Sequence, residues 1–396
     1  MNIRYIVNFI NVKFVIPILV LIRKFYDYKI CLMRTDRLGH LALNSQLFFI
    51  RNKKNLIKNL NYYLIAPSIN SSNIANKDLL LLYIEYSKNL HNVRIICSSS
   101  LYFFFNYSRV LFCTKDFFSA LEARTGGNEF SLAEQTVSFT KKQKKIGDDI
   151  LLQMGITKND KLVSIYSRDS GFLDNLNNQT DWSYHDYRNT NIESYLKTIK
   201  YLIKEGYKVI RIGSDYSKSL EYVNDKYIEY NLSDYKSSFM DLYFPYISSF
   251  IIGCKSGATD VSVVFNTPIL NTNLTIFSES ALGKNDLFIQ KRLLDEKGLI
   301  ISFKDLISDE KYYLYDGNKM KSLYGITYID NSEDEILEAT KEMHKKIMGN
   351  FELSVAQNFL LKRYHKEYCK KNKWSDIAAP ISISWLEKNH HLYLED

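Results

Sequence analysis

The run LVSIYSRDSG, residues 162–171, is an apolar strand candidate that breaks directly into a polar, cationic turn. Two further runs repeat this pattern: YKVIRIGSD at 207–215 and SFIIGCKSGATD at 249–260, the second of which leads into an apolar helix. Strand candidates that alternate with helical segments predict a parallel sheet with helices on both faces. Ligands of such open sheets bind outside the carboxyl ends of the strands. These turns therefore mark the expected site.

The turns after these strands, together with the loop DYRN at 186–189, collect guanidinium, ammonium and small residues. This combination suits an anionic ligand, most simply one that carries phosphates. Each residue also has a structural alternative: Arg168 could pair with Asp169 or Asp174, and Ser256 could serve only as a helix N-cap. His185 is expected to shape the pocket. The expected ligand-binding residues are Arg168, Asp169, Asp186, Arg188, Asn189, Arg211, Gly213, Lys255, Ser256, Gly257 and Asp260.

The first half of the chain shows the same alternation of strand and helix. Strand candidates are YKICLMR at 28–34, YYLIA at 62–66 and VRII at 93–96, whereas 78–87 fits either a helix or a buried strand. A polar, Lys-rich helical run at 131–153 separates the halves, and a capping box at Ser332 opens a helical carboxyl-terminal region. The expected parts are therefore an apolar segment at 1–27, a Rossmann-like domain at 28–150, a second one at 151–331, and a helical region at 332–396.

The totals fit a globular protein of two domains, because 396 residues exceed one ordinary core. The net charge of +8 is mild for this length, and no nucleic-acid recognition motif is present, so nucleic-acid binding is not expected. The five cysteines are scattered and form no Cys-x-x-Cys pair, which argues against disulfides and structural zinc and indicates a reducing compartment. The seven histidines include no metal-binding motif, so no metal site is expected.

The apolar run FVIPILVLI at 14–22 lies between Lys13 and the pair Arg23 and Lys24. It is shorter than the roughly 20 residues that a membrane-spanning helix needs, and no small-residue cleavage site follows it. Two interpretations remain open. The segment 1–27 is either a helix lying in the inner surface of the cytoplasmic membrane or a helix packed on the first domain.

Five motifs give the chain its resemblance to a known family. They are RTDRLGHL at 34–41, RDSG at 168–171, YHDYRN at 184–189, GYKVIRIG at 206–213 and FIIGCKSGATD at 250–260. As a set they resemble bacterial glycosyltransferases associated with surface-polysaccharide loci, which are distantly similar to heptosyltransferases. The resemblance covers most of residues 29–275. It implies the GT-B architecture, an α/β fold in which two Rossmann-like domains face a central cleft.

The resemblance also implies an activity, the transfer of a sugar from a nucleotide-sugar donor to a saccharide or lipid-linked acceptor. The second domain would hold the donor and the first would present the acceptor, without a metal ion or other cofactor. The catalytic base would follow the first strand. The heptosyltransferase pattern has an acidic residue after the glycine, whereas this chain has His40 there, so His40 and Asp36 are both candidates.

Two other functions stay open at this point. Nucleotide-sugar 2-epimerases share the architecture and would isomerise a donor without any acceptor. A scaffold of a polysaccharide-synthesising machine could have kept the fold and lost the chemistry. The expected location is the cytoplasm, with the cytoplasmic face of the inner membrane as the site of any peripheral contact.

Overall fold

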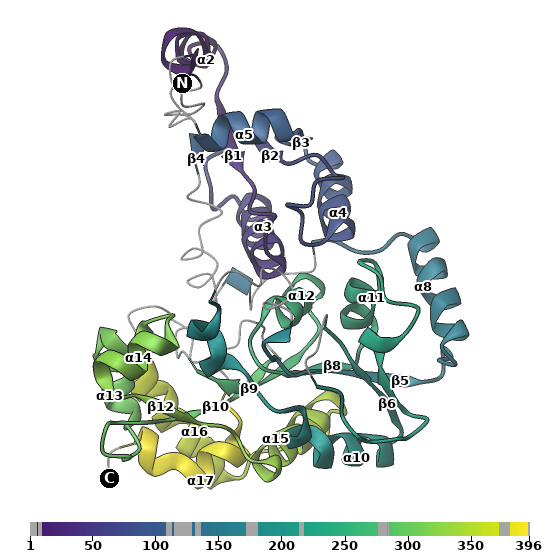
Figure 1. Cartoon of the computed structure of the whole chain (residues 1–396), viewed down its shortest axis with the longest axis vertical. Helices are drawn as coiled ribbons and strands as arrows, with labels where there is room; N and C mark the ends of the chain where they lie inside the picture. The colour runs from purple at the N-terminus through teal and green to yellow at the C-terminus, as the bar shows by residue number, and fades with distance from the viewer. Residues whose placement is uncertain are drawn as a thin grey trace. The chain divides into compact units, whose positions relative to one another are not determined.

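The computed structural model describes residues 6, 10–107, 113–114, 129–130, 136–171, 181–213, 218–275, 283, 285–371 and 381–394. The chain divides into two compact units, which Figure 1 shows in cartoon form. Unit 1 comprises Met1–Ala123 and Ala133–Thr140, and unit 2 comprises Arg124–Leu132 and Lys141–Asp396.

Unit 1 is built on a four-stranded parallel sheet in the order β3-β2-β1-β4. One face packs against helix α5 and the other against α3 and α4, where Tyr83 donates a hydrogen bond to the carbonyl of Ala42. The segment at 78–87, open between helix and strand in the sequence, is helical. The elements are β1 (Tyr28–Leu32), α3 (Leu38–Lys53), β2 (Asn61–Ala66), α4 (Lys77–Lys88), β3 (Val93–Cys97), α5 (Ser99–Tyr107) and β4 (Cys113–Thr114).

Two helical pieces precede the sheet of unit 1: a π-helical turn η1 (Asn11–Val15) and helix α2 (Ile16–Arg23). Leu19 of α2 packs against the apolar cluster around Tyr28, Ile30 and Ile65. None of the helices in the described part of the chain has the length and apolar character that crossing a bilayer requires.

Unit 2 contains a six-stranded parallel sheet in the order β10-β9-β8-β5-β6-β7. Counted within the unit, this is the 3-2-1-4-5-6 order of a doubly wound fold, and the strand order reverses between β5 and β8. The strands are β5 (Lys161–Tyr166), β6 (Tyr207–Arg211), β7 (Tyr227–Glu229), β8 (Phe250–Gly253), β9 (Ile269–Leu274) and β10 (Leu287–Gln290).

Helices cover both faces of this sheet (Figure 1). Helices α11 and α12 pack on one face, and α10 and α15 pack on the other. Strands β11 and β12 form a separate two-stranded antiparallel sheet. The bounds are α8 (Lys141–Gln153), α10 (Leu196–Lys204), α11 (Met240–Ile247), α12 (Gly257–Phe265), β11 (Arg292–Leu294), α13 (Phe303–Ser308), α14 (Gly317–Tyr324), β12 (Thr327–Ile329), α15 (Glu333–Ile347), α16 (Val355–Lys371) and α17 (Ile383–Tyr393).

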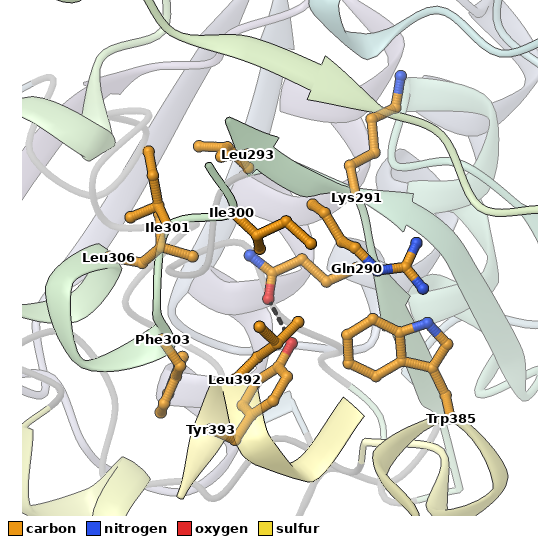
Figure 2. Close-up of a pocket in the computed structure, with 11 residues that line it drawn as sticks. Gln290, Lys291, Leu293, Ile300, Ile301, Phe303, Leu306, Trp385, Leu392 and Tyr393 are labelled. Atoms are coloured by element: carbon orange, nitrogen blue, oxygen red, sulfur yellow. Dashed lines mark hydrogen bonds between the residues drawn. The ribbon is translucent and has the colours of Figure 1, made fainter. Parts of the chain in front are cut away.

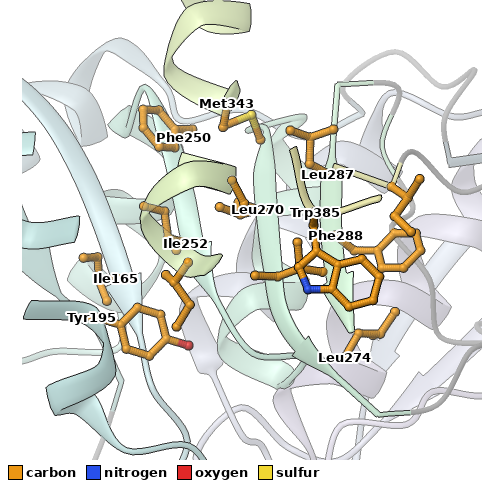
Figure 3. Close-up of a cluster of buried hydrophobic side chains, with 14 of the residues drawn as sticks. Ile165, Tyr195, Phe250, Ile252, Leu270, Leu274, Leu287, Phe288, Met343 and Trp385 are labelled. Atoms are coloured by element: carbon orange, nitrogen blue, oxygen red, sulfur yellow. The ribbon is translucent and has the colours of Figure 1, made fainter. Parts of the chain in front are cut away.

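The main core of unit 2 joins the sheet to its carboxyl-terminal helices. Figure 3 shows Phe250 and Leu270 of the sheet in the same cluster as Met343 of α15 and Trp385 of α17. The described residues at 332–371 and 381–394 are mostly helical, as expected, and they belong to unit 2 because their apolar side chains complete the core of that unit. Ser332 and Glu335 form the expected capping box at the start of α15.

The boundary between the units falls at residue 140, ten residues before the position expected from the sequence. Helix α8 packs on unit 2, where the Tyr243 hydroxyl donates to the Lys144 carbonyl at 3.0 Å and to Asp148 at 2.8 Å. Gly147 lies under the Tyr243 ring, and a Cβ there would be 2.2 Å from a ring carbon. Lys141, Lys142 and Lys145 on the same helix are exposed, so the basic run is a solvated face.

The α/β class, the two Rossmann-like units and the helical carboxyl-terminal region are thus confirmed. The central cleft expected between the two units stays a prediction.

Candidate functional site

The carboxyl ends of β5 and β8 are adjacent at the point where the strand order of unit 2 reverses. Tyr166 pairs with Gly253 there, and a Cβ on Gly253 would lie 2.4 Å from the Tyr166 carbonyl oxygen. Glycine is therefore needed for the two strand ends to approach. In doubly wound folds this reversal opens the crevice that receives the ligand. The polar turns predicted from the sequence emerge at this place.

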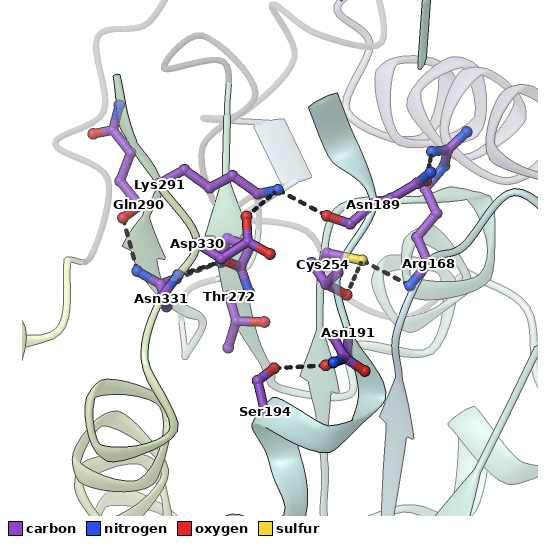
Figure 4. Close-up of polar contacts among 12 residues, drawn as sticks. Arg168, Asn189, Asn191, Ser194, Cys254, Thr272, Gln290, Lys291, Asp330 and Asn331 are labelled. Atoms are coloured by element: carbon purple, nitrogen blue, oxygen red, sulfur yellow. Dashed lines mark hydrogen bonds and ion pairs between the residues drawn. The ribbon is translucent and has the colours of Figure 1, made fainter. Parts of the chain in front are cut away.

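Arg168 follows β5 and is 9% exposed. Its Nη1 donates to the His185 carbonyl at 3.1 Å and to the side-chain oxygen of Asn189, and its backbone N–H donates to the sulfur of Cys254 at 3.2 Å (Figure 4). All these acceptors are neutral. Within the described ranges no carboxylate forms an ion pair with Arg168; Asp174, one partner considered from the sequence, lies outside them.

A second guanidinium, that of Arg188, lies close to the first. Its Nη2 donates to the Lys255 carbonyl at 3.0 Å, which links the loop before α10 to the end of β8. Burial, and then the positive charge of Arg188, lower the pKa of Arg168. Burial also raises the pKa of Tyr166 to about 12, and both guanidiniums act on that hydroxyl. Two cations close enough to repel each other favour an anion beside them.

Ser256 is the N-cap of α12, which is the structural role considered for it from the sequence. The Ser256 side chain accepts hydrogen bonds from the N–H groups of Ala258 and Thr259, and its own N–H donates to the Thr259 hydroxyl at 2.9 Å. Gly257 is the first residue of the helix. The capping box therefore already uses three of the N–H groups at this helix start.

Lys255 and Asp260 neutralise each other. Their side-chain atoms Nζ and Oδ1 are 2.6 Å apart, and the two side chains are 14% and 11% exposed. Asp260 thus lies in the first turn of α12 as a partner of Lys255, and a ligand that used the Lys255 ammonium would compete with this carboxylate.

Asn189 connects Arg168 to a cation that the sequence analysis missed. Its side chain accepts from Arg168 and donates to Asp186 at 2.9 Å, while its carbonyl accepts from Lys291 at 2.7 Å (Figure 4). Lys291 follows β10, is 3% exposed and forms an ion pair of 2.7 Å with Asp330. The polar residues after the apolar run at 287–289 were the signal that could have identified it.

Arg211 does not point freely towards the site. Its side chain is 1% exposed, and its Nη1 lies 3.2 Å from both carboxylate oxygens of Glu229 and 2.8 Å from the Lys218 carbonyl. Its Nη2 donates to the Ser167 hydroxyl at 3.3 Å. Arg211 therefore forms a buried ion pair between β6 and β7, and its ligand-binding role stays a prediction.

Two other expected residues shape the turns at this edge. Gly213 follows β6 with φ of +120°, a conformation that requires glycine. Asp169 accepts a hydrogen bond from the Gly171 N–H at 3.0 Å and so stabilises the turn after Arg168. Ser214 and Asp215, which complete the β6 motif in the sequence, lie outside the described residues.

Aromatic rings line the 3-10 helix η3 (Ser183–Arg188) that carries Arg188. The Trp182 and His185 ring planes are within 10° of parallel with centroids 6.4 Å apart, and the Tyr184 and His185 centroids are 4.0 Å apart. The backbone of His185 is also an acceptor for Arg168. From the sequence, His185 was expected to shape the pocket and Tyr184 was noted only as part of the YHDYRN motif, whereas Trp182 was not identified.

In unit 1, His40 and Asp36 lie after the carboxyl end of β1. The Nδ1 of His40 is 3.2 Å from the Asn44 side-chain oxygen, which leaves Nε2 as the acceptor when Nδ1 carries the proton. Burial, and then the charge of Arg34, lower the pKa of His40 to about 4. Asp36 is half exposed and lies 3.7 Å from the Arg34 guanidinium. The imidazole is thus neutral at pH 7.

Two cavities were found, one beside Lys291 in unit 2 and one in unit 1. One, between β10, β11 and α17, holds about 10 Å³ and has room for a single water molecule (Figure 2). The Tyr393 hydroxyl donates to the Gln290 side chain within it at 2.7 Å. The other holds about 160 Å³ and lies at the amino ends of β2 and β3, where Asn61 and Arg94 contribute to its lining. It is at the opposite edge of the unit 1 sheet from His40.

No cluster of three or more His, Cys, Asp or Glu side chains suited to a metal ion occurs among the described residues.

Comparison with known proteins gives structural likeness at low identity. No protein-family model and no curated protein sequence matches the chain. The glycosyl transferase family 9 structure from Veillonella parvula is 11% identical, with a TM-score of 0.43 over 67% of this chain and 86% of that one. ADP-heptose lipopolysaccharide heptosyltransferase II of E. coli is 12% identical, with a TM-score of 0.36 over 66% and 90%. TibC, an iron-containing dodecameric glycosyltransferase of E. coli H10407, is 12% identical, with a TM-score of 0.37 over 67% and 63%.

Proposed function

We propose that this protein is a glycosyltransferase that uses a nucleotide-sugar donor. The observation that carries the proposal is the pair Arg168 and Arg188 at the strand-order reversal of unit 2. Both lie where doubly wound folds bind nucleotides, and the hydrogen-bond acceptors of the Arg168 guanidinium in the described part of the chain are neutral. A diphosphate group supplies the negative charge that this pair favours, and a guanidinium can contact it with two parallel hydrogen bonds.

The proposed reaction places developing charge beside these cations. An acceptor hydroxyl attacks the anomeric carbon of the donor, and the bond to the nucleoside diphosphate breaks with its electron pair going to the diphosphate. Arg168 and Arg188 stabilise that charge. Electrostatic stabilisation by preorganised donors is usually the largest single contribution to the rate enhancement of an enzyme. Unit 1 supplies the group that takes the hydroxyl proton, with the neutral imidazole of His40 as first candidate and Asp36 as second.

The proposal includes no metal ion, because protein cations take the charge of the leaving group. Turnover in the presence of a chelator tests this part directly. A saccharide or lipid-linked acceptor of cell-surface polysaccharide synthesis fits the resemblance of the motifs, and the cytoplasm is the proposed location.

Binding of nucleoside diphosphates tests the site. At a hundredfold excess over its dissociation constant, a bound diphosphate should stabilise the protein by about 2.7 kcal/mol, or about 5 to 10 °C in a thermal melt. Arg168→Ala should weaken diphosphate binding at least tenfold and lower turnover about a hundredfold, and Arg168→Lys should restore only part of the loss because lysine lacks the planar fork. Arg363→Ala, an exposed arginine on α16, is the matched control.

Three outcomes separate the functions considered. Release of nucleoside diphosphate only when an acceptor is added supports the transferase. Conversion of the donor to an isomer without acceptor would identify an epimerase, and diphosphate binding without turnover on any acceptor would identify a scaffold. Equal diphosphate affinity in the wild type and Arg168→Ala would remove the proposed site altogether.

A further inference from the structure

Helix α2 and the residues on either side of it expose a stripe of large apolar side chains. Phe14, Ile18, Leu21 and Phe25 are 60%, 58%, 57% and 84% exposed. They recur at intervals of four, three and four residues, which places them along one side of a helical segment. Large apolar side chains gathered this way on a surface mark a site of interaction.

The stripe is not a helix face that unit 1 itself covers. Helix α2 already contacts unit 1 through Leu19, which packs on the cluster around Tyr28, and the Tyr28 hydroxyl donates to the Leu19 carbonyl at 2.9 Å. The helix is therefore attached by one side while the stripe remains exposed. This combines the two interpretations that the sequence left open for residues 1–27.

Charge identifies the kind of partner. Residues 1–27 contain four cationic residues, Arg4, Lys13, Arg23 and Lys24, and one acidic residue, Asp27, so the segment carries a net positive charge. Lys13 and Lys24 are exposed and adjoin Phe14 and Phe25 in the chain. Lysines beside an apolar stripe can extend their ammonium groups to lipid headgroups while their stems follow the apolar surface. An apolar stripe with basic neighbours is typical of helices that lie in a membrane interface.

We infer that helix α2 binds this protein to a lipid surface containing anionic headgroups, with Phe14, Ile18, Leu21 and Phe25 inserted at the level of the acyl boundary. A second copy of the chain fits this surface less well, because a two-fold contact would bring the lysines of both copies together. The inference does not depend on the proposed catalytic activity. Binding is measured without donor or acceptor.

Flotation of the full chain with lipid vesicles tests the inference. The protein should float with vesicles of phosphatidylcholine and phosphatidylglycerol, and much less with phosphatidylcholine alone. Leu21→Asp combined with Phe25→Asp should lower the bound fraction at least about tenfold, since burial of one such side chain accounts for a factor of about ten or more. The matched control is Leu232→Asp on unit 2, where the leucine is 66% exposed; it should float like the wild type.

The charge contribution is measured separately. Lys13→Gln combined with Lys24→Gln should remove most of the preference for anionic vesicles, and about 1 M salt should do the same because it shortens the screening length to about 3 Å. All the replaced side chains are exposed, so unchanged thermal melts will show that the variants fold. Unaltered flotation of the Leu21 and Phe25 variant would overturn the inference. The inference would also be overturned if the wild type forms a dimer that does not bind vesicles and the Leu21 and Phe25 variant is a monomer.

Discussion

The buried pair of Arg211 and Glu229 provides the sharpest test of which cations are structural. Glu229 is 15% exposed and accepts hydrogen bonds from the Leu220 N–H at 3.0 Å and the Tyr227 hydroxyl at 2.8 Å in addition to Arg211. Glu229→Gln keeps a side-chain oxygen for Leu220 and Tyr227. It therefore removes mainly the negative charge opposite an arginine that is 1% exposed.

Removal of one member of a buried ion pair costs about 3 to 5 kcal/mol, because the other charge is left without compensation. The lower end applies here, since the hydrogen bonds to Glu229 can persist in glutamine. At about 2 to 4 °C per kcal/mol for a unit of this size, Glu229→Gln should lower the midpoint of thermal unfolding by about 6 to 12 °C. Arg211→Met combined with Glu229→Met should recover most of the loss, because an apolar pair needs no partner charge.

Thermal melts and calorimetric titration with a nucleoside diphosphate should be run on the same proteins. Asp334→Asn is the matched control for a surface pair, since Asp334 is 70% exposed and 2.9 Å from Lys197; it should cost less than about 1 kcal/mol. The reasoning fails if Glu229→Gln costs less than about 1 kcal/mol. It fails equally if the double methionine variant loses diphosphate binding as severely as Arg168→Ala.

Three further predictions concern the strand ends. Acidification from pH 6.5 to 4 should destabilise unit 1 by up to about 3 kcal/mol through His40. Burial and Arg34 lower the pKa of His40 to about 4 in the folded state, so the unfolded chain takes up the proton at a higher pH than the folded one. The His40→Asn variant should lose most of this pH dependence in thermal melts. Gly253→Ala should cost about 2 kcal/mol in denaturant titrations, because its Cβ would be 2.4 Å from a backbone oxygen. Asp260→Asn should strengthen diphosphate binding about threefold by releasing Lys255, and unchanged affinity by calorimetry would place Lys255 outside the reach of the ligand.

The fold could be predicted where strands are apolar and end in polar or glycine-containing turns. The apolar parts of the runs at 162–171, 207–215 and 249–260 form β5, β6 and β8. Strands β7 and β10 were not predicted. Strand β7 has three residues and no periodicity to detect, and β10 was passed over although its four residues are apolar up to Gln290. Both omissions affected the expected site.

The missed strands hid the surroundings of two buried cations at the expected site. Arg211 looked available in the sequence because its partner Glu229 lies on the undetected β7, so a buried ion pair could not be foreseen. Lys291 was overlooked because it follows the undetected β10. Arg168 needed no such information, since it follows the clearest strand and its position depends only on β5 lying at the strand-order reversal.

At the carboxyl ends of the strands of unit 2, some cationic side chains form ion pairs with carboxylates, whereas Arg168 does not. Lys255 has Asp260 at 2.6 Å, Lys291 has Asp330 at 2.7 Å and Arg211 has Glu229 at 3.2 Å. Arg168 has only neutral acceptors among the residues described, although it is as buried as a structural arginine would be. A cation that is buried without a partner charge is costly unless a ligand supplies one. Asp186, which Asn189 links to Arg168, offsets part of this charge, and an anionic group bound at the strand-order reversal would compensate the rest.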